Sequence, residues 1–158
     1  MVLRSSNRLA RLVKRAKQYL TDAALRLAGA RIDSSAVLMD GGLLGRLLDT
    51  FVVSQIRPEL DVRYPRARIH HLRTEGGRQE VKAVIDLGGG RVIGIEIKAG
   101  SAPGARDARH LTWLREQLGD AFVRGIVFHT GPHPFELRGR IWALPIASLW
   151  GAPPHAAT

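Results

Sequence analysis

The chain of 158 residues contains no cysteine. This absence excludes a disulfide scaffold, thiol catalysis, and zinc or iron–sulfur centres held by cysteine. No apolar run approaches the ~18–20 residues that cross a bilayer. The basic first residues also lack the apolar block of a secretory signal. We therefore expect a cytoplasmic protein that has no membrane partner.

Acidic residues are scarce, since 14 Asp and Glu face 24 Lys and Arg, and the formal net charge is +10. The first 21 residues hold six basic side chains and no acidic one. Such an excess favours nucleic acid as a partner, whereas a solvated arginine-rich surface is the plain alternative. The candidate DNA-contacting residues are Arg8, Arg11, Lys14, Arg15, Lys17, Arg106 and Arg109.

The spacing of apolar residues predicts one α/β domain. Helical spacing covers residues 8–20, 23–28, 43–60 and 107–118. Pro58 is expected to bend or end the third of these helices. From residue 67 the period changes to two, which is typical of strands. The expected strands are 67–73, 81–87, 92–98, 125–130 and 141–144, with a short helix or turn at 146–150.

Glu96 and Lys98 are the most distinctive charged pair of the chain. Residues two apart on a strand point to the same face. A carboxylate and an ammonium so placed are typical of the second half of the PD-(D/E)xK nuclease pattern. There, an Asp of the preceding strand and the Glu bind a divalent ion, and the Lys polarises the attacking water. A solvated salt bridge is the plain alternative.

Three glycines at 88–90 predict the register of the hairpin, in which paired residue numbers sum to 178. Val81, Ala83 and Ile85 then share an apolar face. Lys82 lies opposite Glu96, with Cβ atoms ~4.5–5.5 Å apart. We therefore expect the ammonium of Lys82 where a metal-binding Asp belongs, neutralising Glu96.

Two other carboxylates of the hairpin, Asp86 and Glu80, are candidate metal ligands. Asp86 lies four residues from Lys82, roughly 13 Å along the strand at ~3.3 Å per residue. A Mg²⁺ ion needs its ligands within ~2.0–2.1 Å, so Asp86 joins Glu96 only through a bulge or a register slip. Glu80 lies opposite Lys98, and an ion pair between these two is the simpler interpretation.

Histidines and tryptophans offer weaker candidates. His70 or His71 lines the site or packs at an edge, and the two cannot share one metal because adjacent strand residues face opposite ways. His129 and His133 flank a loop without a third ligand, so we expect structural roles for them. The three tryptophans are expected to be core or edge anchors rather than platforms for stacking bases.

Four motifs together resemble one family. They are "LVKRAKQYLTDAAL", "LLGRLLDTFVVSQIRPEL", "HHLRTEGGRQEVKAVIDLGGGRVIGIEIKAG" and "GIVFHTG" followed by "IWALPIASLW". They are similar to the C-terminal domain of unknown function that follows the ATPase module in bacterial and archaeal AAA-type ATP-binding proteins. The resemblance covers nearly the whole chain and implies a restriction-endonuclease-like fold, a mixed central sheet flanked by helices.

The resemblance also implies roles for residues. Asp49 matches the family's helix acid, Glu80 the Glu of its E-V-D motif, and Glu96 and Lys98 its I-E-V-K pair. Lys82 falls on the Asp of E-V-D, so the metal site is expected to be degenerate. Residues 1–20 correspond to a remnant of the winged-helix region, 21–150 to the nuclease-like domain and 151–158 to a tail.

Three functions follow as hypotheses. The first is a nuclease-like domain that binds DNA through its basic surface without catalysis. The second is an interaction module for a separate ATPase, since the chain has no GxxxxGK[ST] loop of its own. The third is an active endonuclease using Glu96, Lys98 and Asp49 with a displaced Asp86 or Glu80. Mg²⁺ or Mn²⁺ is expected only in the third case, and the oligomeric state stays open.

Overall fold

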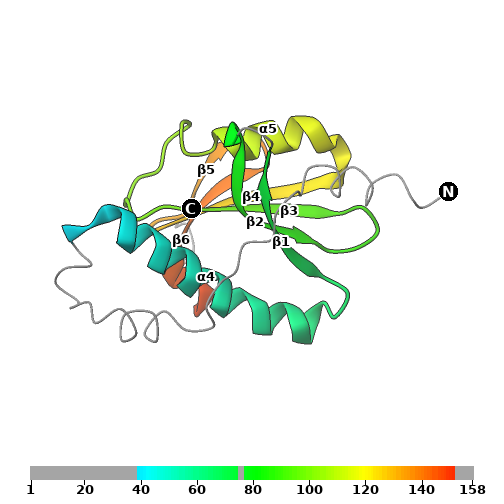
Figure 1. The fold of residues 1–158 in the computed structure, drawn as a ribbon, viewed down its shortest axis with the longest axis horizontal. Helices are drawn as coiled ribbons and strands as arrows, with labels where there is room; N and C mark the ends of the chain where they lie inside the picture. Colours follow the sequence, from blue (N-terminus) through cyan, green and yellow to red (C-terminus); the bar gives the residue numbers. More distant parts are fainter. Residues whose placement is uncertain (1–38, 75–76, 152–158) are drawn as a thin grey trace, which may run out of the picture.

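A six-stranded mixed sheet lies between two helices (Figure 1). The computed structural model describes residues 39–74 and 77–151. The helices are α4 (Gly41–Arg63) and α5 (Arg109–Leu118), with short 3-10 helices η2 (Gly119–Ala121) and η3 (Ile146–Leu149). The strands are β1 (Arg68–Arg73), β2 (Glu80–Asp86), β3 (Val92–Ile97), β4 (Phe122–His129), β5 (Phe135–Arg138) and β6 (Ile141–Pro145).

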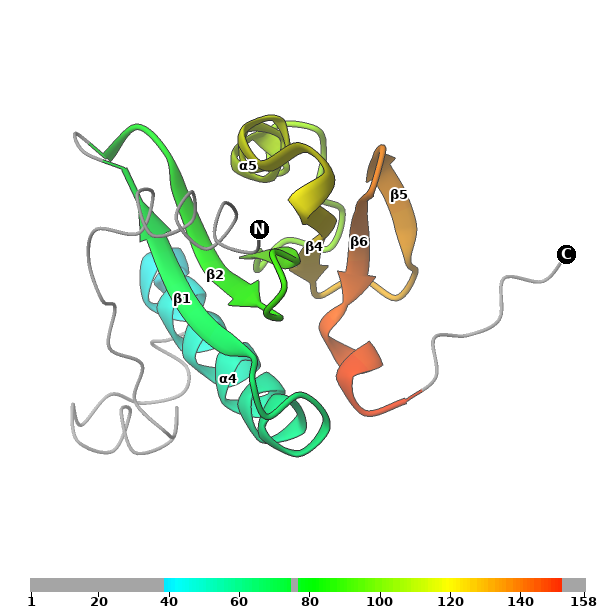
Figure 2. The ribbon, with the colours of Figure 1, turned by 90° about the vertical axis from the view of Figure 1, so that its right-hand side faces the viewer.

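The strand order in the sheet is β1-β2-β3-β4-β6-β5. The first three strands are antiparallel neighbours, β3, β4 and β6 are parallel, and β5 returns antiparallel to β6. Figure 2 shows β1 and β5 at opposite edges. The parallel step from β3 to β4 passes through α5, as a parallel connection requires a crossover. The expected mixed α/β architecture is confirmed.

Helix α4 is longer than its sequence pattern indicates. The carboxylate of Asp40 caps it by accepting bonds from the main-chain nitrogens of Gly42 and Leu43 at 2.9 and 3.0 Å. The helix continues through Pro58 to Arg63, so it does not end at Pro58. Pro58 is exposed, so its ring lies on the solvent side of the helix rather than in the core.

Two apolar clusters cover the two faces of the sheet. On the α5 side Leu111 and Leu114 pack with Phe122, and all three are fully buried. On the α4 side Val52 packs with Ile95, Phe128 and their neighbours. Burial of such side chains contributes roughly 1.5–3 kcal/mol each to folding. The sheet therefore contributes one of its faces to each cluster.

The register of the hairpin is confirmed, because Ala83 pairs with Ile95 and Ile85 with Ile93. Strand β2 nevertheless contains a bulge. Between its pairs with His70 and Leu72, β1 has one residue where β2 has two, so His71 faces both Lys82 and Ala83.

The bulge changes which face the side chains of β2 occupy. Val81 lies in the α5-side cluster, whereas Ala83 and Ile85 lie in the α4-side cluster. The expected common face of these three residues is therefore wrong at Val81. The extra residue interrupts the strict alternation at the position of Lys82, the residue on which the site depends.

Smaller differences concern the ends of elements. Helix α5 begins two residues later than expected, at Arg109, and β5 (Phe135–Arg138) was not expected at all. The four residues of β5 are mostly exposed, so they have no hydropathy period to detect. The helices expected at 8–20 and 23–28 lie outside the described residues. In the described part of the chain, neither helix has the length and hydropathy needed to cross a membrane.

Two glycine substitutions test the packing of α5 on the sheet. A Cβ atom on Gly94 would lie 2.7 Å from Leu111 Cδ2 and 3.2 Å from Leu114 Cδ2. Gly94→Ala should lower the free energy of unfolding by about 1–3 kcal/mol. Gly45→Ala, in α4 with nothing within 4 Å of its Cβ, should raise it by about 0.5–1 kcal/mol. Urea unfolding measures both, and similar effects would contradict the close contact of α5 with β3.

Candidate functional site

An ion pair between α4 and β2 forms the centre of a charged cluster. The Lys82 Nζ lies 3.0 Å from Asp49 Oδ2, and the Asp49 side chain is 3% exposed. Asp49 occupies the buried side of α4, next to Thr50, which is equally buried. The expected neutralisation of Glu96 by Lys82 is corrected, because Asp49 makes the direct pair. The bulge at Lys82 and Ala83 accounts for this change of partner.

The environment keeps Lys82 charged. Burial acts to lower the pKa of its ammonium, but the hydrogen bond and the charge of Asp49 act to raise it. Glu80 and Glu96 add further negative potential, and the net result is a raised pKa. Lys82 therefore remains an ammonium ion throughout the physiological range.

Glu96, the acid of β3, is buried in the fold, and 2% of its surface is exposed. Its Oε1 has no hydrogen-bond partner among the described residues. Burial raises the pKa of Glu96 to about 8, although the charges of Lys98 and Lys82 oppose the shift. The main-chain N–H of Lys82 also donates to this carboxyl group. Glu96 is therefore mainly protonated at neutral pH.

Lys98 points toward the start of α5. Its Nζ lies 3.3 Å from Asp107 Oδ1, so the expected ion pair with Glu80 is not formed. The other carboxylate oxygen of Asp107 accepts a bond from the Gly104 main-chain N–H at 2.9 Å. That bond and the nearby Lys98 and Arg106 outweigh the effect of burial and lower the pKa of Asp107.

Glu80 instead approaches a histidine of β1. Its Oε1 lies 3.6 Å from His71 Nε2, and His71 Nδ1 lies 3.3 Å from the Lys82 carbonyl oxygen. His71 is 8% exposed, so of the two adjacent histidines it is His71 that lines the cluster. The bulge places this ring beside the main chain of Lys82, which strict alternation does not predict.

A second histidine joins the edge of the cluster from α5. His110 Nδ1 lies 2.7 Å from Gln79 Oε1, and His110 Nε2 accepts a bond from Arg109 Nε at 3.0 Å. Burial, with the charges of Arg109 and Lys98, lowers the pKa of His110 and favours its neutral form. Gln79 and His110 lie 31 positions apart, so no local sequence signal reveals this contact.

Basic side chains form a rim beside this cluster, along the loop and the first turn of α5. Lys98 is 36% exposed, and Arg106 and Arg109 are both exposed. We call these three residues the α5 rim. The other candidate DNA-contacting residues, Arg8, Arg11, Lys14, Arg15 and Lys17, lie outside the described residues.

Asp86 is not brought to the cluster. It pairs with Val92 beside the turn, and its Oδ1 accepts a bond from the Gly88 main-chain N–H at 2.8 Å. The pairing of β2 with β3 has no irregularity that would shift it toward Glu96. The proposed metal pair of Glu96 and Asp86 is therefore not assembled. Within residues 39–74 and 77–151, no group of three His, Asp or Glu side chains has the geometry of a metal site.

A family model described as a domain of unknown function, DUF4143, matches residues 44–149. The chain belongs to this family. The match runs from α4 to η3 and includes Asp49, Lys82, Glu96 and the α5 rim, whereas the basic first segment lies outside it. No curated protein matches the chain.

The raised pKa of Glu96 predicts a pH dependence of stability. Because the folded state holds this proton up to about pH 8 and the unfolded chain releases it near 4.5, stability should fall as pH rises between these values. The slope is at most about 1.4 kcal/mol per pH unit. Glu96→Gln should remove this decline in urea unfolding.

An exposed carboxylate provides the control. The side chain of Glu59 is 69% exposed, so Glu59→Gln should leave the decline as it is in the wild type. A wild-type stability that is constant or rises from pH 5 to 8 would contradict a protonated Glu96.

Proposed function

We propose that this DUF4143 domain is a restriction-endonuclease-like module that binds DNA through a basic surface and carries a degenerate metal site. The observation that carries the proposal is the 3.0 Å contact of the Lys82 ammonium with Asp49, beside the buried Glu96. A helix acid, a strand glutamate and a strand lysine are the residue types that the nuclease pattern requires. In this proposal the Lys82 ammonium, paired with Asp49 and near Glu96, takes the part of the divalent cation.

The electrostatics of the cluster favour the ammonium over a metal ion. A Mg²⁺ ion requires charged carboxylates at about 2.0–2.1 Å in near-octahedral geometry. Glu96 holds a proton at neutral pH, and Asp49 is already neutralised by Lys82. Metal binding would thus require the loss of one proton and the displacement of a partly buried cation. This arrangement supports binding without hydrolysis.

The α5 rim supports DNA as the partner. Arginine and lysine side chains bind phosphate through charge-assisted hydrogen bonds. Lys98, Arg106 and Arg109 place three such groups next to the cluster, in a chain with a net charge of +10. A phosphodiester backbone lying over the start of α5 would meet all three. Partnership with a separate ATPase, implied by the resemblance of the motifs, is the alternative that the experiments distinguish.

Binding to duplex DNA should depend strongly on salt. Each phosphate contact contributes about 0.9 to the slope of log affinity against log salt. Three contacts therefore lower the affinity about 40-fold for a fourfold rise in salt concentration. Replacing Arg106 and Arg109 by Ala should reduce the slope by about 2. Fluorescence anisotropy with a labelled duplex measures both quantities.

Arg91→Ala is the matched control, because Arg91 is exposed at the hairpin turn, away from the α5 rim. It should change the slope little. A failure to bind at low salt, together with co-purification of an ATPase, would favour the interaction module instead.

Replacing the ammonium should restore the acidic site. Lys82→Asp removes the cation that pairs with Asp49 and adds a third carboxylate near Glu96. We expect the variant to bind Mn²⁺ in calorimetry and the wild type not to. Lys82→Met, which removes the charge without adding an acid, is the control. Mn²⁺ binding and plasmid cleavage by the wild type, both lost in Glu96→Ala, would show an active nuclease instead.

A further inference from the structure

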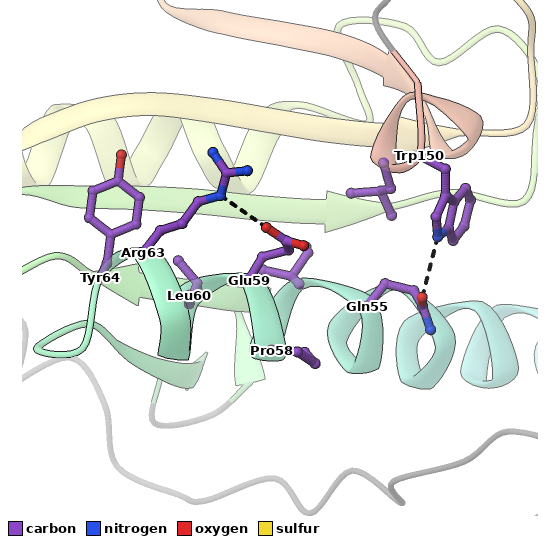
Figure 3. A pocket seen from close by; sticks show the side chains of 9 residues that line it. Gln55, Pro58, Glu59, Leu60, Arg63, Tyr64 and Trp150 are labelled. Carbon is purple, nitrogen blue, oxygen red and sulfur yellow. Dashed lines mark hydrogen bonds and ion pairs between the residues drawn. The ribbon is translucent and has the colours of Figure 1, made fainter.

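A groove of about 370 Å³ separates the C-terminal half of α4 from η3 (Figure 3). Ile56, Leu60 and Leu149 give it an apolar lining, and Arg63 projects beside it. Tyr64 and Trp150 lie toward its two ends in Figure 3. We call it the α4–η3 groove. Its lining on α4 runs from Gln55 to Arg63, on both sides of Pro58.

The two aromatic rings of the groove are unusually exposed. Trp150 is 56% and Tyr64 53% exposed. Trp150 is nevertheless held in place, because its Nε1 donates to Gln55 Oε1 at 3.4 Å and its ring centroid lies 5.5 Å from that of Phe51. A fixed, exposed indole is a ready surface for stacking. Trp150 thus packs on Phe51 as an edge anchor would, while more than half of its surface stays exposed.

One arginine lines the groove, and two more line a neighbouring pocket. Arg63 lines it, and a second pocket of about 290 Å³ on the other side of Leu60 is lined by Arg57 and Arg68. All three are exposed. Two acids also lie here, Glu59 in the groove and Asp61 in the second pocket. Glu59 is bound to Arg63 Nε at 3.0 Å, and the side chains of Arg63 and Glu59 are 73% and 69% exposed. Pairs this exposed contribute little, so a phosphate can compete with Glu59 for Arg63.

We propose that the α4–η3 groove binds an unstacked base of a single-stranded nucleic acid. The base stacks on Trp150 or Tyr64, and the flanking phosphates contact Arg63, Arg57 and Arg68. Sequence-independent single-strand sites combine these two features, aromatic platforms and a basic track. The charged pair on the groove wall disfavours an apolar peptide helix, which would bury Glu59 and Arg63.

The inference rests on the proposed nucleic-acid binding and adds a second contact with a preference for single strands. Arg63 lies 14 positions after Asp49 on α4, which is about 21 Å at 1.5 Å per residue. A single DNA strand that lies along α4 would thus extend from the charged cluster to the groove. Duplex DNA does not offer a free base face at the groove, so the two forms of DNA should respond differently to its mutation.

Anisotropy titrations of labelled oligothymidine and of a duplex test the groove. Trp150→Ala and Tyr64→Ala should each weaken oligothymidine binding about tenfold, and Trp150→Phe by less. Binding of the duplex should be unchanged in all three variants. Val62→Ala is the matched control, because Val62 is 80% exposed on α4 and does not line the groove. Oligothymidine should also quench tryptophan fluorescence in the wild type but not in Trp150→Phe.

The outcomes separate the two proposals. Unchanged oligothymidine affinity in Trp150→Ala and Tyr64→Ala, with duplex binding intact, would overturn the groove and leave the proposed function standing. No binding of either DNA at low salt would overturn both. If oligothymidine affinity is unchanged and Trp150→Ala abolishes self-association in sedimentation, the groove is an interface between copies of the chain. Urea unfolding confirms that each variant is folded.

Discussion

The ion pair of Lys82 with Asp49 is the contact on which the site depends. It joins β2 to α4 across the edge of the α4-side cluster, and the acid has 3% of its side chain exposed. A carboxylate this deeply buried needs a compensating charge, and the loss of one partner of a buried pair costs about 3–5 kcal/mol. The pair therefore holds α4 to β2, and both of its charges act on the pKa of Glu96.

The protonation of Glu96 follows mainly from its own burial, and the charge of Asp49 acts in the same direction. The charges of Lys98 and Lys82 oppose the shift without cancelling it. Asp49 holds the ammonium at 3.0 Å, and Glu96, whose pKa rises to about 8, takes a proton. The cluster thereby approaches neutrality without a divalent ion. On the proposed function, Lys82 would supply the positive charge that a metal-dependent nuclease obtains from its cation.

Local pattern predicted the hairpin well and its side-chain contacts poorly. The glycines of the turn determine the pairing of Ala83 with Ile95, so the register could be read from the chain. No residue of the sequence marks the bulge at Lys82. The bulge places the side chain of Val81 on the α5 side of the sheet. Lysine side chains are long enough to choose among several acids, so the partners of Lys82 and Lys98 depended on tertiary placement.

Helix α4 contributes to two different surfaces, the charged cluster and the α4–η3 groove, because it continues past Pro58. Its N-terminal half carries Asp49 into the buried cluster, and its C-terminal half carries Arg63 and leads to Tyr64 at the groove. A helix that ended at Pro58 would place neither Arg63 nor Tyr64 at the groove. Because Pro58 faces solvent while Ile56 and Leu60 pack against the core, packing keeps the last turns helical despite the missing hydrogen bond. The packing that keeps α4 helical beyond Pro58 therefore also forms one wall of the groove.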